Sequence, residues 1–190
     1  MLLVLVTLSC LVAVQAQTLP CCMMDKQWSA TMIDAQIMVK GNNVTSDFFY
    51  DGVNSSISIQ YYEFGNTRRV RLNKTVTLYS KKVRYNISPD GNCTKKNITD
   101  LMLPYCIPDT ALYRGSSYLG DEGSMLKIDG WHFPLGSLNI TMSVSDYDCV
   151  PIIAGVAGMS DYSPFNTLLY FNGHKAGITD PTAFDVPSNC

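Results

Sequence analysis

Apolar and polar side chains alternate along much of this chain with a period of two, which is typical of β-strands with one face toward a core. The alternation is cleanest where Leu138, Ile140, Met142 and Val144 are separated by polar residues. The same pattern, or a short apolar run, predicts strands within residues 29–39, 57–61, 76–78, 83–87, 126–133 and 165–171. There is no long amphipathic helix, so the pattern predicts a single all-β domain, either a sandwich or an open barrel.

Two stretches interrupt this pattern. Residues 93–105 lose the period of two and predict either a short helix or a loop that covers the sheet. Asn172-Gly173 predicts a turn after the last strand, and residues 177–190 hold too many Pro and Asp residues for a helix. This tail ends in Cys190, so we expect a disulfide to pin it across the sheet; the alternative is a frayed terminus.

The N-terminus resembles a secretory signal. Residues 1–16 hold no charged side chain and end in Val14-Gln15-Ala16, with small residues at the positions that signal peptidase reads. The apolar run is too short to span a bilayer, and an uncleaved anchor is the alternative. We therefore expect a signal peptide at 1–16, one domain at 17–190, secretion to the extracellular space and no transmembrane span.

Cysteines and glycosylation motifs agree with secretion. Without the signal, an even number of cysteines remains, which predicts disulfide bonds: Cys21, Cys22, Cys93, Cys106, Cys149 and Cys190. Seven Asn-x-Ser/Thr motifs occur, and we expect a glycoprotein modified at Asn43, Asn54, Asn73, Asn86, Asn97 and Asn139. The seventh, Asn92, adjoins a cysteine; it and Asn86, whose motif precedes Pro89, are the least favoured.

Charge and motifs argue against nucleic-acid binding and catalysis. The formal net charge is −2, and the basic residues are scattered. The two histidines, His132 and His174, are far apart in the sequence, and no nucleophile elbow, zinc-protease motif or phosphate loop is present. We therefore expect a non-catalytic protein.

Calcium is a candidate cofactor without assigned ligands. It takes six to eight oxygen ligands, usually with several converging carboxylates. The acidic residues that could contribute are Asp47, Asp51, Asp121, Glu122, Asp146, Asp148 and Asp180. None has the spacing of an EF-hand, and acidic residues in turns more often face solvent or cap a helix.

Several stretches, taken in order, resemble the ependymin family of secreted glycoproteins. They are Cys22 with Trp28, Phe49-Tyr50-Asp51 with Asn54, Tyr85-Asn86-Ile87 with Cys93, Ile107-Pro108, Trp131, Cys149-Val150-Pro151, and the tail Gly177-Ile178-Thr179-Asp180-Pro181 with Phe184, Pro187 and Cys190. The chain departs from the family pattern at Ser55-Ser56, where an Arg-rich strand is usual, and in two additional cysteines, Cys21 and Cys106.

This resemblance implies a fold, a set of disulfides and a range of partners. The fold would be two stacked, curved antiparallel sheets that enclose an apolar pocket, similar to bacterial lipoprotein carriers. Cys22 would pair with Cys149 and Cys93 with Cys190, which leaves Cys21 and Cys106 to pair with each other or with another molecule. Lipid binding, calcium binding, cell–matrix adhesion and a homodimer are further expectations.

The function that we favour from the sequence is therefore binding of a lipid or other apolar ligand between curved sheets. Flexible methionines suit an adaptable wall, although the same residues could fill a closed core. The candidate pocket residues are Ile57, Ile59, Tyr61, Tyr85, Leu138, Ile140, Met142, Val144, Leu168 and Tyr170. A glycan on Asn139 would force Leu138 and Ile140 inward. The alternative function is a calcium-binding matrix or adhesion glycoprotein with a filled core.

Overall fold

The computed structural model describes residues 19–41, 43–64, 68–160 and 163–190; the expected signal peptide lies outside them. Eleven strands form one sheet in the order β6-β5-β4-β3-β2-β1-β11-β10-β9-β8-β7, and all its pairings are antiparallel. The strands are β1 (Gln27–Asp34), β2 (Val44–Asp51), β3 (Ser56–Phe64), β4 (Arg69–Leu78), β5 (Val83–Ile87), β6 (Cys93–Asn97), β7 (Leu112–Leu119), β8 (Leu126–Leu135), β9 (Leu138–Ser145), β10 (Pro151–Ser160) and β11 (Ser163–Ala176). Two short helical elements accompany them, α1 (Ala35–Val39) and the 3-10 turn η1 (Tyr79–Lys81).

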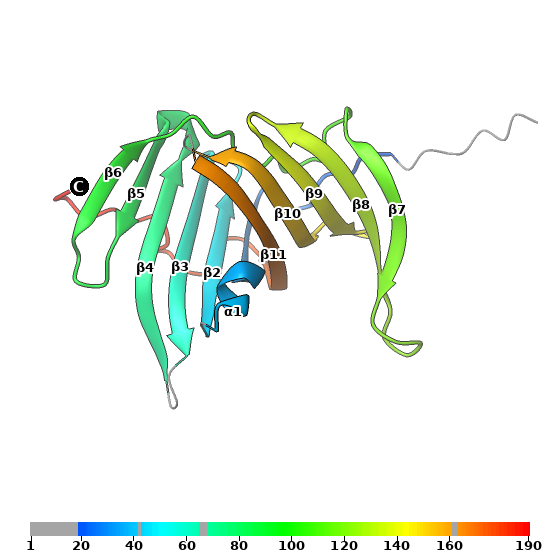
Figure 1. Ribbon diagram of the computed structural model, residues 1–190, viewed down its shortest axis with the longest axis horizontal. Helices are drawn as coiled ribbons and strands as arrows, with labels where there is room; N and C mark the ends of the chain where they lie inside the picture. Colours follow the sequence, from blue (N-terminus) through cyan, green and yellow to red (C-terminus); the bar gives the residue numbers. More distant parts are fainter. Residues whose placement is uncertain (1–18, 42, 65–67, 161–162) are drawn as a thin grey trace, which may run out of the picture.

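The sheet is strongly curved and open, with β6 and β7 at its two outer edges (Figure 1). The predicted all-β class and curved antiparallel architecture are confirmed. In place of two separate sheets, the pairing of β1 with β11 joins both halves into one continuous sheet. Phe48 and Ile57 from the first half belong to the same buried cluster as Phe133 and Ile140 from the second half. The concave faces of the two halves therefore share one interior.

Strands with one apolar face form where the alternation predicts them. On β9, Ile140, Met142 and Val144 are buried, whereas Asn139 and Thr141 are exposed. The predicted segments 57–61 and 83–87 lie in β3 and β5. Burial of every second side chain fixes the register of these strands, because a slip by one residue would expose the whole apolar set.

The strand predicted over residues 29–39 is wrong in its second half. The strand β1 ends at Asp34, and residues 35–39 form the short helix α1. The Asp34 side chain caps this helix, since its Oδ1 accepts a hydrogen bond from the Gln36 N–H at 2.8 Å. A local cap thus overrides the alternation of apolar residues after Asp34.

The turn predicted at Asn172-Gly173 is also wrong, because β11 continues through it to Ala176. Between the pairs Ser29–Lys175 and Thr31–Asn172 the register shifts by one extra residue on β11. Gly173 lies in this bulge with φ 62°, a conformation that glycine adopts without steric cost. The Asn-Gly pair therefore marks a β-bulge inside a long strand.

The C-terminal tail, residues 177–190, is pinned across the sheet as predicted. The Ser58 hydroxyl donates to the Ala183 carbonyl at 2.6 Å, and Lys74 Nζ donates to the Thr182 carbonyl at 3.1 Å. A disulfide then joins Cys190 to Cys93 on the edge strand β6. In Figure 1 the tail passes behind the first half of the sheet and ends beside β6. It therefore covers the face of this half opposite the shared interior.

Residues 98–111, which we call the cover segment, contain neither helix nor strand. Ile98 and Ile107 are buried, and Leu103 packs against the core cluster. Of the two forms predicted for residues 93–105, the covering loop is therefore observed from residue 98 onward. The prediction is wrong for residues 93–97, which form the edge strand β6 by pairing with β5. No helix in the described part of the chain is long and apolar enough to cross a membrane.

Candidate functional site: a half-open cavity inside the curved sheet

One end of the shared interior is filled by aromatic side chains. The Trp28 ring is fully buried, with the rings of Phe48, Tyr50 and Phe171 at centroid distances of 5.0, 5.5 and 5.9 Å. The Tyr50 hydroxyl donates to the Leu103 carbonyl at 2.8 Å, which ties the cover segment to this cluster. Part of the interior is therefore a solid core.

Beyond this cluster the interior is hollow. A half-open cavity of about 400 Å³ lies between the two halves of the sheet and the cover segment. Its lining residues are Met32, Asp34, Phe48, Ile57, Ile59, Tyr61, Thr75, Thr77, Tyr79, Arg84, Asn86, Asp100, Leu101, Leu103, Leu135, Leu138, Ile140, Met142, Ala154, Val156, Phe165, Leu169 and Phe171. This volume is within the usual range of small-molecule sites, roughly 300–1,000 Å³.

The two walls of the cavity differ in chemistry. All the lining residues from strands β8 to β11 are apolar, for example Leu138, Ile140, Val156 and Leu169. The opposite wall, from β3 to β5 and η1, combines Ile57 and Ile59 with side chains that can form hydrogen bonds. We call this second wall the polar wall, and its polar members are Tyr61, Thr75, Thr77, Tyr79, Arg84 and Asn86.

Hydrogen bonds between neighbouring strands organise the polar wall. Arg84 Nε donates to Thr77 Oγ1 at 3.3 Å, and Arg84 Nη2 forms an ion pair with Asp100 Oδ2 at 3.2 Å. The Thr75 hydroxyl donates to Asn86 Oδ1 at 3.2 Å. The ion pair joins β5 to the cover segment, so the wall and the cover are held together.

Tyr61 extends the polar wall toward the start of α1. Burial raises the pKa of the Tyr61 phenol, the negative charge of Asp34 raises it further, and the positive charge of Arg84 acts in the opposite direction. The phenol is therefore neutral at physiological pH and can donate a hydrogen bond.

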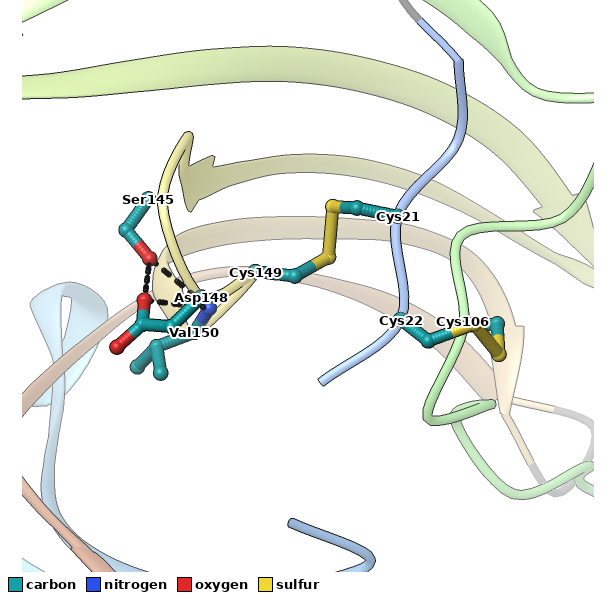
Figure 2. Close-up of a disulfide and its surroundings, with 7 residues drawn as sticks. All are labelled: Cys21, Cys22, Cys106, Ser145, Asp148, Cys149 and Val150. Atoms are coloured by element: carbon teal, nitrogen blue, oxygen red, sulfur yellow. Dashed lines mark hydrogen bonds between the residues drawn. A yellow bond between two sulfur atoms is a disulfide. The ribbon is translucent and has the colours of Figure 1, made fainter. Parts of the chain in front are cut away.

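Two disulfides fasten the N-terminal segment beside the core. The structure corrects the expected pairing of the adjacent cysteines: Cys21 bonds Cys149, and Cys22 bonds Cys106. Figure 2 shows the two bonds leaving the segment toward different parts of the chain. Relative to the expected pairing, Cys21 and Cys22 have exchanged partners. Cys22 forms a β-bridge with Cys106, which places their Cα atoms 3.8 Å apart.

The turn that presents Cys149 is itself stabilised by hydrogen bonds (Figure 2). The Ser145 hydroxyl donates to Asp148 Oδ1 and accepts from the Val150 N–H at 3.0 Å. Cys149 has a positive φ of 58° there. Asp148, a candidate calcium ligand from the sequence, thus has a structural role in this turn.

Six of the ten candidate pocket residues line the cavity: Ile57, Ile59, Tyr61, Leu138, Ile140 and Met142. Val144 is buried in the core cluster outside the cavity. Tyr85 alternates with Arg84 and Asn86, which face the cavity, so its side chain has the opposite direction.

On β11 the candidates were Leu168 and Tyr170, and both side chains are more than a third exposed. Their neighbours Leu169 and Phe171 line the cavity instead. Apolar residues occupy both phases of this strand, so alternation could not select the inward set. The polar wall was missed as well, since Thr75, Thr77, Arg84 and Asn86 have the pattern of solvated positions.

The asparagines of the predicted glycosylation motifs, Asn43, Asn54, Asn73, Asn86, Asn97 and Asn139, are all exposed. Asn139 is exposed while the next residue, Ile140, is 2% exposed, which is the arrangement that a glycan at Asn139 requires. Asn86 differs from the others because it lines the cavity. A glycan there would occupy the space between the two walls.

Within the described ranges, no three His, Cys, Asp or Glu residues converge where a metal ion could bind. Two of the candidate calcium ligands form ion pairs: Asp47 pairs with Arg69 at 2.7 Å, and Asp146 with Lys127 at 3.0 Å. Asp51, Asp121 and Asp180 accept hydrogen bonds from nearby backbone N–H groups in turns.

Comparison with known proteins gives one family and one fold. Residues 67–190 match the Ependymin family. No match is found among curated proteins. An uncharacterized conserved protein from Thermus thermophilus has a similar crystal structure, with a TM-score of 0.52, 11% sequence identity, and coverage of 87% of this chain and 88% of that chain. At this identity the likeness concerns the fold alone.

Proposed function

This chain belongs to the ependymin family, and we propose that it is a secreted glycoprotein that binds a lipid or other apolar ligand in the cavity of its curved sheet. The observation that carries this proposal is the half-open cavity of about 400 Å³ with one wholly apolar wall. Family membership and three disulfide bonds support a secreted, disulfide-bonded and non-catalytic protein. Glycosylation and cleavage after Ala16 are further parts of the proposal.

Burial of an alkyl chain supplies the driving force for binding. Each CH₂ group removed from water contributes about 0.8 kcal/mol, so a chain of about twelve carbons gains on the order of 10 kcal/mol before the costs of association. Ile57 and Ile59 on one wall and Ile140 and Val156 on the other can contact such a chain from both sides. Met32 and Met142, which also line the cavity, can adapt to different chain shapes.

The first experiment is native mass spectrometry of the protein secreted from eukaryotic cells, followed by extraction with organic solvent. We expect additional mass in the native state that is released on extraction and identified as lipid. Absence of lipid, together with failure of the stripped protein to bind added amphiphiles, would reject the carrier function. The alternative, a matrix or adhesion glycoprotein, would then be favoured.

A pair of variants on one strand tests whether the cavity is the site. Val156→Trp places a large side chain in the cavity and is expected to abolish most lipid binding. Ala157→Trp is the control, because Ala157 is the next residue on β10 and is exposed. Equal loss of lipid in both variants, or in neither, would contradict binding in this cavity.

A further inference from the structure

The charged groups that line the cavity are Asp34, Arg84 and Asp100. The Arg84 guanidinium is already engaged, because it pairs with Asp100 at 3.2 Å and donates to Thr77 at 3.3 Å. Asp34 forms no ion pair with any residue in the described ranges, and its Oδ1 accepts the N–H of Gln36. The cavity therefore presents two carboxylates and one guanidinium that is already neutralised.

The field of Asp34 extends into the cavity. Besides burial, its charge is a cause of the raised pKa of the Tyr61 phenol, which lines the same space, and it outweighs the opposing charge of Arg84. A second negative charge placed beside Tyr61 would meet the same repulsion, strengthened by the low dielectric of a partly buried site. The electrostatics of the polar wall thus oppose an anionic head group.

The same wall offers neutral hydrogen-bonding groups. Among the residues that the structure describes, none is hydrogen-bonded to the Tyr61 hydroxyl or to the amide nitrogen of Asn86. Both side chains line the cavity, and the Asn86 oxygen is held by Thr75, which fixes the direction of the amide. A phenol and an amide are suited to the hydroxyl and ester oxygens of a neutral head group.

From these observations we infer that the cavity selects an uncharged, hydroxylated amphiphile, of the monoacylglycerol type, over a fatty acid or another anionic lipid. The alkyl chain would contact the apolar wall of β8–β11, and the head group would bind Tyr61 and Asn86 on the polar wall. This inference rests on the proposed function, since it names the class of ligand for the same cavity.

The test compares two ligands that share one alkyl chain and differ in head-group charge. Delipidated secreted protein is titrated at neutral pH with dodecanoate and with 1-monododecanoylglycerol by calorimetry. We expect the glyceride to bind at least about tenfold more tightly, the ratio that repulsion by a single partly screened carboxylate would produce. Equal or tighter binding of dodecanoate would overturn the inference and leave the proposed function intact. If neither ligand binds and the secreted protein holds no lipid, both are overturned.

Two variants assign the selectivity to named residues. Asp34→Asn removes the charge and keeps a good helix cap. The ratio of the dissociation constants for dodecanoate and the glyceride should therefore fall toward one, mainly because dodecanoate binds more tightly. Tyr61→Phe should weaken glyceride binding about two- to tenfold through loss of a hydrogen bond, whereas Tyr170→Phe, outside the cavity, should not. An unchanged ratio in Asp34→Asn, or equal effects of the two Tyr→Phe variants, would contradict the assignment.

Discussion

Among single residues, Asp51 shows how one carboxylate holds a connection in place. It ends β2, is 5% exposed, and accepts hydrogen bonds from the Val53 and Asn54 N–H groups at 3.1 and 2.9 Å and from Asn54 Nδ2 at 2.7 Å. Burial opposes the ionisation of Asp51, but hydrogen bonds from Asn54, Gln27 and Val53 outweigh it, so the pKa of Asp51 is below its ordinary value. The charged form therefore stabilises the native state.

This shift gives a prediction about pH. Asp51→Asn should lower the free energy of unfolding at neutral pH by about 1–2 kcal/mol, because charged hydrogen-bond acceptors are lost. Since the folded pKa is below the unfolded one, the contribution of the carboxylate is complete above pH ~4 and is lost as the pH falls through the folded value. Urea unfolding of both proteins across this range measures the difference. A difference that stays constant down to the lowest pH would contradict the role of the carboxylate.

At Asn86 the predicted glycan and the proposed ligand compete for one space. Because the residue lines the cavity and its motif precedes Pro89, we predict that Asn86 is unmodified in the secreted protein. Glycopeptide mapping should find occupancy at Asn139, whose side chain faces solvent beside the buried Ile140. Full occupancy at Asn86 would contradict a ligand site on the polar wall.

Among the elements, the C-terminal tail depends on contacts that are distant in sequence. It has no helix or strand beyond β11, and it is held by Ser58, Lys74 and the disulfide from Cys93 to Cys190. This bond closes a loop with a sequence separation of 97 residues, for which the chain-entropy description gives roughly 4–5 kcal/mol of stabilisation.

We therefore predict a large loss of stability in the double variant Cys93→Ser/Cys190→Ser, which leaves no unpaired thiol. Its midpoint of unfolding should fall, and hydrogen exchange in residues 177–190 should increase, because only hydrogen bonds and packing, among them the contacts of Ser29, Ser58 and Lys74, then hold the tail. The double variant Cys22→Ser/Cys106→Ser is the comparison, since it should leave the tail protected. Unchanged exchange in the tail after loss of its own disulfide would contradict the anchoring role.

How far the elements could be predicted depends on their local pattern. The strands β3, β5 and β9 could be predicted because apolar residues occupy only one phase of residues 57–61, 83–87 and 138–144. The edge strand β6, Cys-Thr-Lys-Lys-Asn, has no apolar alternation and exists because it pairs with β5. The inward phase of β11 could not be chosen between Leu168 and Leu169, since only packing against the opposite half distinguishes them.

The candidate site also has a part that local alternation predicts and a part that depends on tertiary packing. Its apolar members on β3 and β9 follow from alternation, but Thr75, Thr77, Arg84 and Asn86 look like solvent-facing residues until the second half of the sheet and the cover segment enclose them. The sequence also could not show which partner bonds Cys21 and which bonds Cys22. These two cysteines are adjacent, so their sequence separations from any third cysteine differ by only one residue. Contacts over long sequence separations decide both features.

For the whole molecule, an open sheet leaves two edges that could pair with another chain. At one edge, β6 carries the exposed residues Lys95, Lys96 and Asn97, and Asn97 is a predicted glycosylation site. At the other edge, β7 is interrupted by a register shift between Tyr113 and Gly115, where Gly115 has φ 106°. Charges at one edge and an irregular backbone at the other are common protections against edge-to-edge association.

We predict that the lysines of β6 keep this edge unpaired. In Lys95→Thr/Lys96→Thr, the two charges are replaced by side chains with high strand propensity, so β6 should pair with β6 of a second molecule and give oligomers larger than those of the wild type. Light scattering after gel filtration measures the molecular mass of the oligomers. Both the edge variant and the wild-type comparison carry Asn97→Gln, so that a glycan at this position cannot cover the edge. The control Lys40→Thr/Lys175→Thr removes the same charge from exposed positions away from both edges. If the control associates as strongly as the edge variant, net charge and not edge protection governs the oligomeric state; if neither associates, a feature of β6 other than its lysines keeps the edge free.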